Sequence, residues 1–166
     1  MGLLEPHGRG RGLFWRDALS HPSPPVIVVH SLTHAVAALQ AAAAADRDII
    51  LLSAPNAGIY AGAGWWKALI DAAREAQPEA KSLAILDCGG DAGAMQAALR
   101  AGIEAVIFTG RADVAERLAA IAEARGSRLL TARPLPALDL AVGFFANGET
   151  LRRSCADLLA SWPAIC

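Results

Sequence analysis

The sequence predicts an α/β fold of parallel strands, and three observations lead to this prediction. Short apolar runs rich in Val, Ile and Leu recur along the chain. Most are followed by a stretch whose apolar residues lie three and four positions apart, which is the spacing of an amphipathic helix. Glycine, proline and aspartate mark the boundaries between the two kinds of segment. Strands that alternate with helices in this way are parallel and are joined by right-handed crossovers.

This alternation is compatible with two architectures. One is a partial (half) TIM-type barrel, and the other is an open, doubly wound sheet of five or six strands. Uninterrupted apolar runs are typical of strands that are buried on both faces. The expected strands are therefore 26–30, 49–53, 83–87, 105–109 and 128–132. The run 138–145, LDLAVGFF, could be a sixth strand or buried irregular chain.

The helix predictions rest on apolar spacing and on end signals. Ser31 or Thr33 can cap the first helix and Asp91 a later one, because their side-chain oxygens can accept free backbone N–H groups. Gly102 and Gly126 follow two helices, where glycine readily adopts the left-handed stop. The expected helices are one ending at Ala45, one over about 64–77, one ending at Arg100, one carrying Val114, Leu118 and Ile121, and an amphipathic one over 147–162.

Length and composition predict one domain preceded by an arm. A chain of 166 residues has the usual size of a single domain. Residues 1–25 are rich in Gly, Pro and Arg, and their SHPSPP stretch cannot be helical, so we expect an N-terminal arm. Its Phe14 and Trp15 could dock on the domain or on a partner chain. The α/β domain is expected over 26–166, with helix 147–162 at its end.

Composition also argues against several classes of protein. Charges interrupt every apolar run before it reaches the roughly 20 residues of a membrane span, so no membrane partner is expected. The N-terminus lacks the apolar core of a secretory signal. Net charge is −1 and the arginines are dispersed, which predicts no nucleic-acid partner. Three cysteines without a CxxC motif are typical of a cytoplasmic protein without disulfides.

Both architectures bind ligands at the carboxyl ends of their strands. This rule locates the candidate site before any motif is considered. The ligand-binding residues expected there are His30, Ser53, Asn56, Tyr60, Cys88, Gly89, Thr109, Gly110 and Arg111, with Asp87 as the catalytic candidate.

Asp87 and Cys88 follow the third expected strand. A carboxylate at a buried strand end can act as a general acid or base, and the structural alternative is that Asp87 accepts backbone N–H groups of the glycine turn. Cys88 could be a nucleophile or a metal ligand, and its alternative is a small packing residue. His30 could line the site alone or share a metal with His34.

Two loops could hold an anion. SAPNAGIYAGAG, which contains Tyr60, is small and glycine-rich, so its backbone N–H groups could approach a ligand, although it could equally be a flexible connector. Thr109, Gly110 and Arg111 combine a hydroxyl, a backbone N–H and a guanidinium at a helix start. Such a group can hold a phosphate or carboxylate, unless Arg111 is a solvated surface charge.

Three stretches between about Leu32 and Gly110 follow one another in a recognisable order: SLTHAVAALQAAAAADRDIILLSA, SAPNAGIYAGAGWWKALIDAA and AILDCGGDAGAMQAALRAGIEAVIFTG. In their order and spacing they resemble the first half of the class II fructose-bisphosphate aldolases, which are zinc-dependent (β/α)₈ barrels. In that family the third strand ends His-x-Asp-His-Gly or similar, where the Asp is the catalytic acid/base and the next His binds zinc. The resemblance implies that Asp87 takes the acid/base position and Cys88 the zinc position.

The sequence departs from the family pattern at three points, one of which is Cys88 in place of the zinc-binding histidine. Ile85 stands where the family has its first histidine, and the family's other zinc ligands and phosphate loops come from later strands that these residues do not supply. Cysteine can ligate zinc, so Cys88 is a candidate metal ligand and zinc a candidate cofactor, without full aldolase coordination.

These observations predict a domain that binds a small anionic metabolite, is related to class II aldolases and lacks full aldolase activity. One alternative is a metal-assisted lyase or isomerase that uses Asp87 as acid/base. Another is a non-catalytic subunit or regulatory interaction protein. A half-barrel has exposed parallel edges, so a homo-oligomer, in the simplest case a homodimer, is expected.

Overall fold

The computed structural model describes residues 23–163, so Phe14, Trp15, Cys166 and nearly all of the expected arm lie outside the described residues. Its strands are β1 (Val26–Val28), β2 (Ile49–Leu52), β3 (Ser82–Asp87), β4 (Ala105–Ile107), β5 (Arg128–Leu130) and β6 (Leu138–Asp139). Its helices are α2 (Leu32–Ala45), α3 (Ala57–Tyr60), α4 (Ala63–Ala76), α5 (Ala92–Arg100), α6 (Ala112–Ala124), α7 (Gly148–Ser161) and the 3₁₀ helix η1 (Leu140–Gly143). No helix among the described residues is long and apolar enough to cross a membrane.

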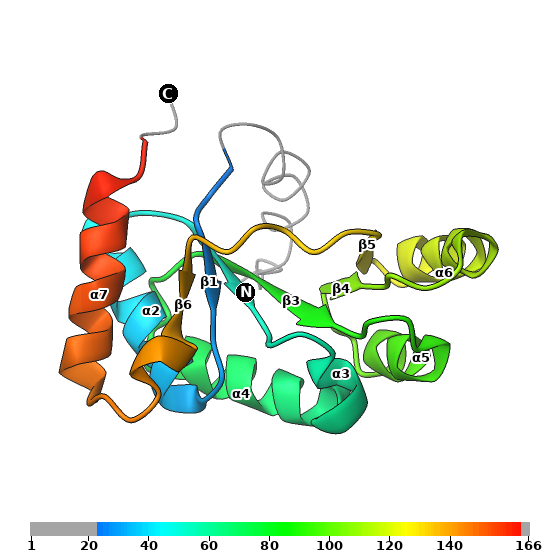
Figure 1. Ribbon diagram of the computed structural model, residues 1–166, viewed down its shortest axis with the longest axis horizontal. Coiled ribbons are helices and arrows are strands. Elements are labelled where there is room, and N and C mark those ends of the chain that lie inside the picture. The colour runs from blue at the N-terminus through cyan, green and yellow to red at the C-terminus, as the bar shows by residue number, and fades with distance from the viewer. Residues whose placement is uncertain (1–22, 164–166) are drawn as a thin grey trace, which may run out of the picture.

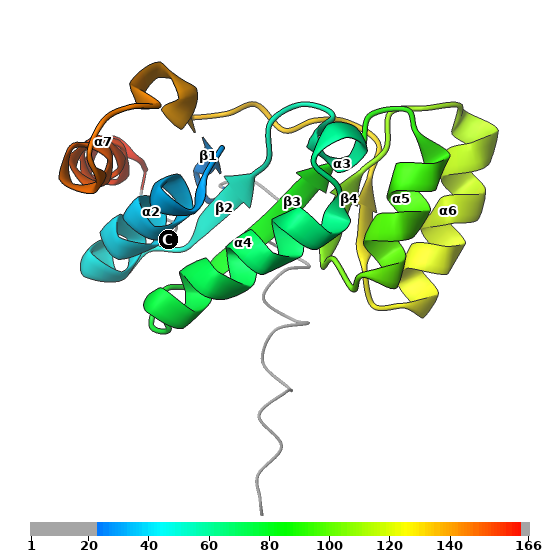
Figure 2. The ribbon, with the colours of Figure 1, turned by 90° about the horizontal axis from the view of Figure 1, so that it is seen from below.

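The six strands form one parallel sheet in the order β5-β4-β3-β2-β1-β6. Strands β1 to β5 lie side by side in chain order, and right-handed crossovers between such neighbours place their helices on one face. Figures 1 and 2 show the helices covering one side of the sheet in an arc. This arrangement corresponds to the partial barrel, because a doubly wound sheet carries helices on both faces.

Strand β6 lies next to β1, at the opposite edge of the sheet from β5 (Figure 1). The chain reaches it through residues 131–137, which we call the crossover segment. In a closed barrel the last strand pairs with the first, so β6 and α7 take the place of the last strand and helix of a barrel. Accordingly, α7 packs beside α2, the helix that follows β1. The run 138–145 thus supplies a sixth strand of two residues and then a 3₁₀ helix. The alternative of buried irregular chain is wrong, because Val142 and Phe145 are exposed.

The sheet separates two groups of buried side chains. On the helix-covered face, alternate strand residues such as Ala84 and Leu86 pack against the helices. On the other, concave face, Leu83 and Ile85 join apolar residues of β1, β2 and β4. Side chains of a strand alternate between the faces. Asp87 therefore continues the concave face, and Cys88 continues the helix face.

Most expected helix ends are confirmed. The Ser31 hydroxyl accepts the N–H of His34, and an Asp91 carboxylate oxygen accepts the N–H of Ala94 at 2.7 Å. Gly102 and Gly126 have φ values of 73° and 69° after α5 and α6. The sequence did not predict two short elements, the 3₁₀ helix η1 and α3, a four-residue turn of helix inside the SAPNAGIYAGAG loop.

Candidate functional site

Asp87 is the central residue of the carboxyl-end edge of the sheet. It is the last residue of β3 and only 4% exposed. One carboxylate oxygen, Oδ1, accepts the N–H of Gly89 at 2.8 Å. Gly89 has a φ of 53°, which lets the chain turn back toward the carboxylate. The structural alternative weighed for Asp87, a bond to the glycine turn, is therefore present, although it uses only one of the two oxygens.

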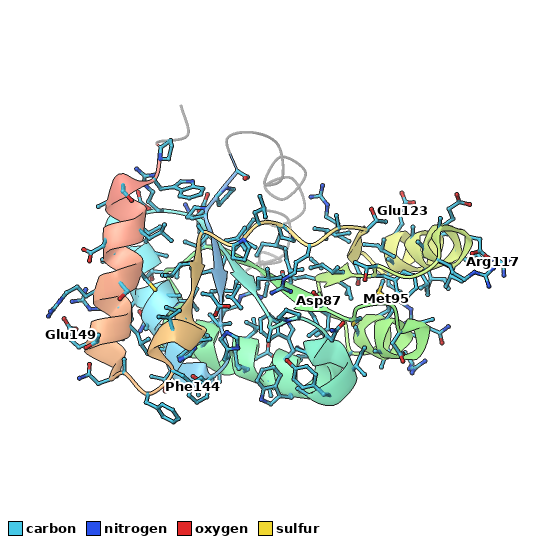
Figure 3. The ribbon with its side chains drawn as sticks, in the orientation of Figure 1. Asp87, Met95, Arg117, Glu123, Phe144 and Glu149 are labelled. Atoms are coloured by element: carbon cyan, nitrogen blue, oxygen red, sulfur yellow. The ribbon has the colours of Figure 1, made fainter. Side chains whose placement is uncertain are left out.

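The second oxygen of Asp87 is bound by a residue from the crossover segment. Arg133 Nη1 donates to Asp87 Oδ2 at 2.6 Å, and Arg133 Nη2 donates to the Ser53 carbonyl at 2.7 Å. The guanidinium therefore connects the ends of β2 and β3. Its side chain is 23% exposed, against 6% for Asp87, so the ion pair is partly shielded from water. Figure 3 shows Asp87 near the centre of the molecule.

Ser53 has a structural role within this cluster. It is fully buried, and its hydroxyl accepts the Asp87 N–H at 2.9 Å while donating to the Ala54 carbonyl at 3.0 Å. The hydroxyl thus fixes the backbone of β3 against the end of β2. Ser53 belongs to the site as expected, but the group that it offers to Arg133 is its carbonyl rather than its side chain.

A second polar group lies where β1 and β6 end. His30 Nε2 and Asp139 Oδ1 are 2.6 Å apart, and the same oxygen accepts the Ala141 N–H at 2.9 Å. Burial by itself would raise the pKa of Asp139. The Ala141 N–H, the bond and charge of His30, and the charge of Arg133 outweigh burial, so the pKa of Asp139 is lowered.

His34 lies behind this pair. Its Nδ1 accepts the backbone N–H of His30 at 3.3 Å, and its ring meets the rings of His30 and Phe144 edge to face. The side chain is 1% exposed, and Nε2 makes no hydrogen bond of good geometry to a described residue, although the backbone of Phe144 is near enough to act on the ring and opposes the effect of burial. Burial lowers the pKa of His34. The imidazole is therefore neutral, with its proton on Nε2 because Nδ1 acts as an acceptor.

Cys88 is turned away from the strand-end site. It is fully buried on the helix face, and a Cβ added at Gly58 of α3 would lie 2.5 Å from its sulfur. Burial, followed by the charges of Asp87 and Asp91, raises the pKa of the thiol to about 12. A thiolate, which is the form that attacks carbonyls and binds metals, is disfavoured there. The placement supports the packing role of Cys88 and not its expected role as ligand or nucleophile.

The remaining expected residues fall into two groups. The Thr109 N–H donates to the Gly89 carbonyl at 2.8 Å, and Gly110 approaches Gly90, so the loops after β3 and β4 are joined. Asn56 also belongs here, since its amide oxygen occupies the space that a Cβ at Gly89 would need.

Tyr60 and Arg111 are more peripheral. Tyr60 is 68% exposed on α3. The guanidinium of Arg111 is 80% exposed and donates to both carboxylate oxygens of Asp113. This agrees with the alternative of a solvated surface charge.

The expectation of zinc was tested against the donor atoms present. Among residues 23–163 no group of three or more His, Cys, Asp or Glu side chains is placed to hold a metal ion. The Cys88 thiol is in the core, and both oxygens of Asp87 already accept hydrogen bonds. These residues do not fit a zinc ion in the arrangement that the aldolase resemblance implies.

Sequence reasoning missed Arg133 and Asp139. The strand-end rule was applied to the first four strands, and extending it past the fifth would have reached the crossover segment and Arg133. Asp139 could not be placed in this way, because its position depends on the pairing of β6 with β1, in which Val28 lies opposite Asp139.

Among the comparisons with known proteins, the one with solved structures gives a match. No family model matches the chain, and no curated protein matches it. Among solved structures it is similar to a putative fructose-1,6-biphosphate aldolase from Coccidioides immitis, with a TM-score of 0.53 and 20% sequence identity. The alignment covers 64% of this chain and 39% of that chain. The chain therefore spans well under half of that protein, and the similarity establishes a shared α/β fold.

Proposed function

We propose that the domain binds a small anionic metabolite at the carboxyl-end edge of its sheet. The observation that carries this proposal is the guanidinium of Arg133, held across the ends of β2 and β3. A guanidinium has five N–H donors, and only two contacts to described residues use them. The others remain for the carboxylate or phosphate oxygens of a ligand, which guanidinium groups bind well.

Asp87 competes with such a ligand for the charge of Arg133. Substitutions of Asp87 and of Arg133 should therefore change the affinity for an anion in opposite directions. Removing the carboxylate in Asp87→Asn leaves Arg133 without its anionic partner, so affinity for an anion rises. Removing the guanidinium in Arg133→Gln lowers the affinity for an anion by roughly 10- to 100-fold, since a hydrogen bond to a charged group contributes about 1.5–3 kcal/mol.

Isothermal titration calorimetry with inorganic phosphate, pyruvate and acetol phosphate tests these opposite effects. The double variant Asp87→Asn/Arg133→Gln replaces both charged groups with neutral amides, so it leaves no buried lone charge, and it should not bind. Arg125→Gln removes an exposed arginine after α6 and should bind like the wild type. Equal affinities in wild type, Asp87→Asn and the double variant would show that no anion binds at Arg133.

The lyase or isomerase alternative places the chemistry on Asp87. Asp87 already accepts one hydrogen bond at each oxygen, from Gly89 and from Arg133, and the charge of Arg133 favours the ionised carboxylate, so Asp87 would have to act as a base through a remaining lone pair. The alternative predicts that Asp87→Asn abolishes turnover of a substrate without strengthening anion binding. The same set of variants therefore distinguishes the two proposals.

The interaction-protein alternative is favoured by a different observation. Leu135, Val142 and Phe145 are 91%, 96% and 98% exposed, and each lies in or after the crossover segment. Exposed apolar side chains mark a contact surface where they form one contiguous patch, so the alternative requires that these three do. If they mediate the proposed homodimer, Val142→Ser/Phe145→Ser should shift the sedimentation coefficient to that of a monomer, whereas Leu32→Ser, on a half-exposed leucine of α2, should not.

A further inference from the structure

We propose that His30 and Asp139 form an acid–base dyad, in which His30 exchanges a proton with the bound metabolite and Asp139 orients its ring. This inference rests on the proposed function, since it assigns a reaction to the same strand-end edge. The sequence assigned this role to neither residue: it placed His30 among the lining residues, with a metal shared with His34 as the alternative, and it did not single out Asp139.

The fold brings the two residues together from distant parts of the chain. They are 109 positions apart, and parallel pairing of β1 with β6 sets Val28 opposite Asp139. His30 comes two residues after Val28, whose side chain belongs to the concave face. The alternation of a strand thus directs His30 and Asp87 toward the same face of the sheet.

Asp139 has the properties of an orienting group. Its net pKa shift is downward despite burial, so it is ionised at neutral pH. An ionised carboxylate 2.6 Å from Nε2 of His30 favours a proton on that nitrogen. Nδ1 is then the basic atom. No described residue shares a hydrogen bond with Nδ1, and the His30 side chain as a whole is 18% exposed, so we place the ligand's reacting C–H bond at this atom.

His34 fixes the dyad without competing for its proton. Its Nδ1 holds the backbone N–H of His30, and burial keeps its ring neutral. One hydrogen bond, to His34, therefore fixes the main chain of His30 at the end of β1, and a second, to Asp139, fixes its ring. Such restraint of both parts is what a general base needs to act in one geometry.

The charges at the edge suit proton abstraction next to a carbonyl. Nδ1 of His30 would accept the proton of a C–H bond, and the electron pair of that bond would move to form a C=C bond while the carbonyl π electrons move to oxygen. The product pair is an imidazolium and an enolate. Asp139 stabilises the imidazolium, and Arg133, which lies at the ends of β2 and β3 on the same edge of the sheet, is the cation that we assign to the enolate. Return of the proton restores both groups, so no other reactant is needed.

The substrate class that follows is a small anion with an acidic C–H bond beside a ketone or aldehyde. Pyruvate and acetol phosphate are probes of this class, one a carboxylate and the other a phosphate monoester. In D₂O, the full-length protein should accelerate exchange of their C–H hydrogens for deuterium, as followed by proton NMR. His30→Gln should slow the catalysed exchange by about 10²–10⁴-fold, the usual contribution of a general base.

Asp139 is a positioning residue, so its test needs a readout that a structural role would not change. Asp139→Ser keeps an oxygen to cap η1 but removes the carboxylate. Nitrogen-15 NMR of histidine-labelled protein should show neutral His30 protonated at Nε2 in the wild type and as a mixture of tautomers in Asp139→Ser. Asp113→Ser, which removes an exposed carboxylate from α6, should change neither the tautomer nor the exchange.

The outcomes separate failure of the dyad from failure of the anion site. If the probes bind but exchange no faster than in buffer, or His30→Gln exchanges as fast as the wild type, the dyad is overturned and the anion site stands. If neither probe binds, the anion site fails for this class. The tautomer measurement needs no ligand, so finding the His30 proton on Nδ1 overturns the dyad in either case.

Discussion

Arg133 and Asp87 form an ion pair across 46 residues of sequence, with Nη1 and Oδ2 separated by 2.6 Å. The pair joins the crossover segment to the centre of the sheet. In a closed barrel, further strands would fill the gap between β5 and the strand that pairs with β1. Here a short segment spans this gap, and Arg133 anchors it on β2 and β3.

We expect the Arg133–Asp87 pair to be strongly coupled in stability. Arg133→Gln leaves a buried carboxylate with one hydrogen bond to Gly89, and such losses typically cost about 3 kcal/mol or more. Asp87→Asn/Arg133→Gln should be less destabilised than the sum of its single variants. Urea denaturation of all three measures the coupling, with Arg125→Gln as the control. Additive effects would mean that the pair is not formed in solution.

Gly58 is expected to tolerate no side chain. A Cβ there would lie 2.5 Å from the Cys88 sulfur and 3.1 Å from the Asp87 carbonyl, so Gly58→Ala should cost about 1–3 kcal/mol of unfolding free energy. Cys88→Ala in the same chain should recover part of this loss by removing the sulfur. Gly64→Ala is the matched control, because a Cβ at Gly64 in α4 meets nothing within 4 Å and alanine favours helix. A stable Gly58→Ala protein would contradict the packing of α3 on β3.

The buried thiols should be inert in the folded state. Burial raises the pKa of Cys88 to about 12 and that of Cys155 to about 11, so little thiolate is present at neutral pH. In a Cys166→Ser background, labelling by 5,5′-dithiobis(2-nitrobenzoate) should be slow in buffer and complete in urea. Rapid labelling of Cys88 without denaturant would show instead that its sulfur is accessible to solvent and could serve as a metal ligand.

His34 should make the protein less stable in mild acid. Because burial lowers its pKa in the folded state, the unfolded chain binds the proton more readily. Stability is therefore full above the ordinary pKa of about 6.5 and declines as pH falls below it, by at most about 1.4 kcal/mol per pH unit for one proton.

Urea denaturation at pH 7.5 and 5.5 measures this effect of His34. A His34→Gln variant retains a side-chain acceptor but does not titrate in this range, so its stability should change less between the two pH values. The lowered pKa of Asp139 acts in a more acidic range, below its ordinary value near 3.8. An equal pH dependence in wild type and His34→Gln would assign the loss of stability to another group.

Much of the fold followed from local sequence patterns. The apolar runs, the caps at Ser31 and Asp91, and the stops at Gly102 and Gly126 are set by neighbours in the chain, so they could be read directly. The strand-end rule also located Asp87, Ser53 and Gly89, which do lie together. Successive side chains of a strand point to opposite faces, so Asp87 points to the concave face and Cys88 to the helices. The sequence therefore already indicated that Asp87 and Cys88 could not both belong to one site.

The sequence by itself determined the order of strands and helices, since hydrophobic spacing and capping act over a few residues. The tertiary structure decided which face of the sheet the helices cover, that β6 lies beside β1, and that Arg133 meets Asp87 while Asp139 meets His30. These pairings depend on the distance that the crossover segment spans between β5 and β6. No local pattern encodes that distance, because two residues brought together by a crossover have no fixed spacing in sequence.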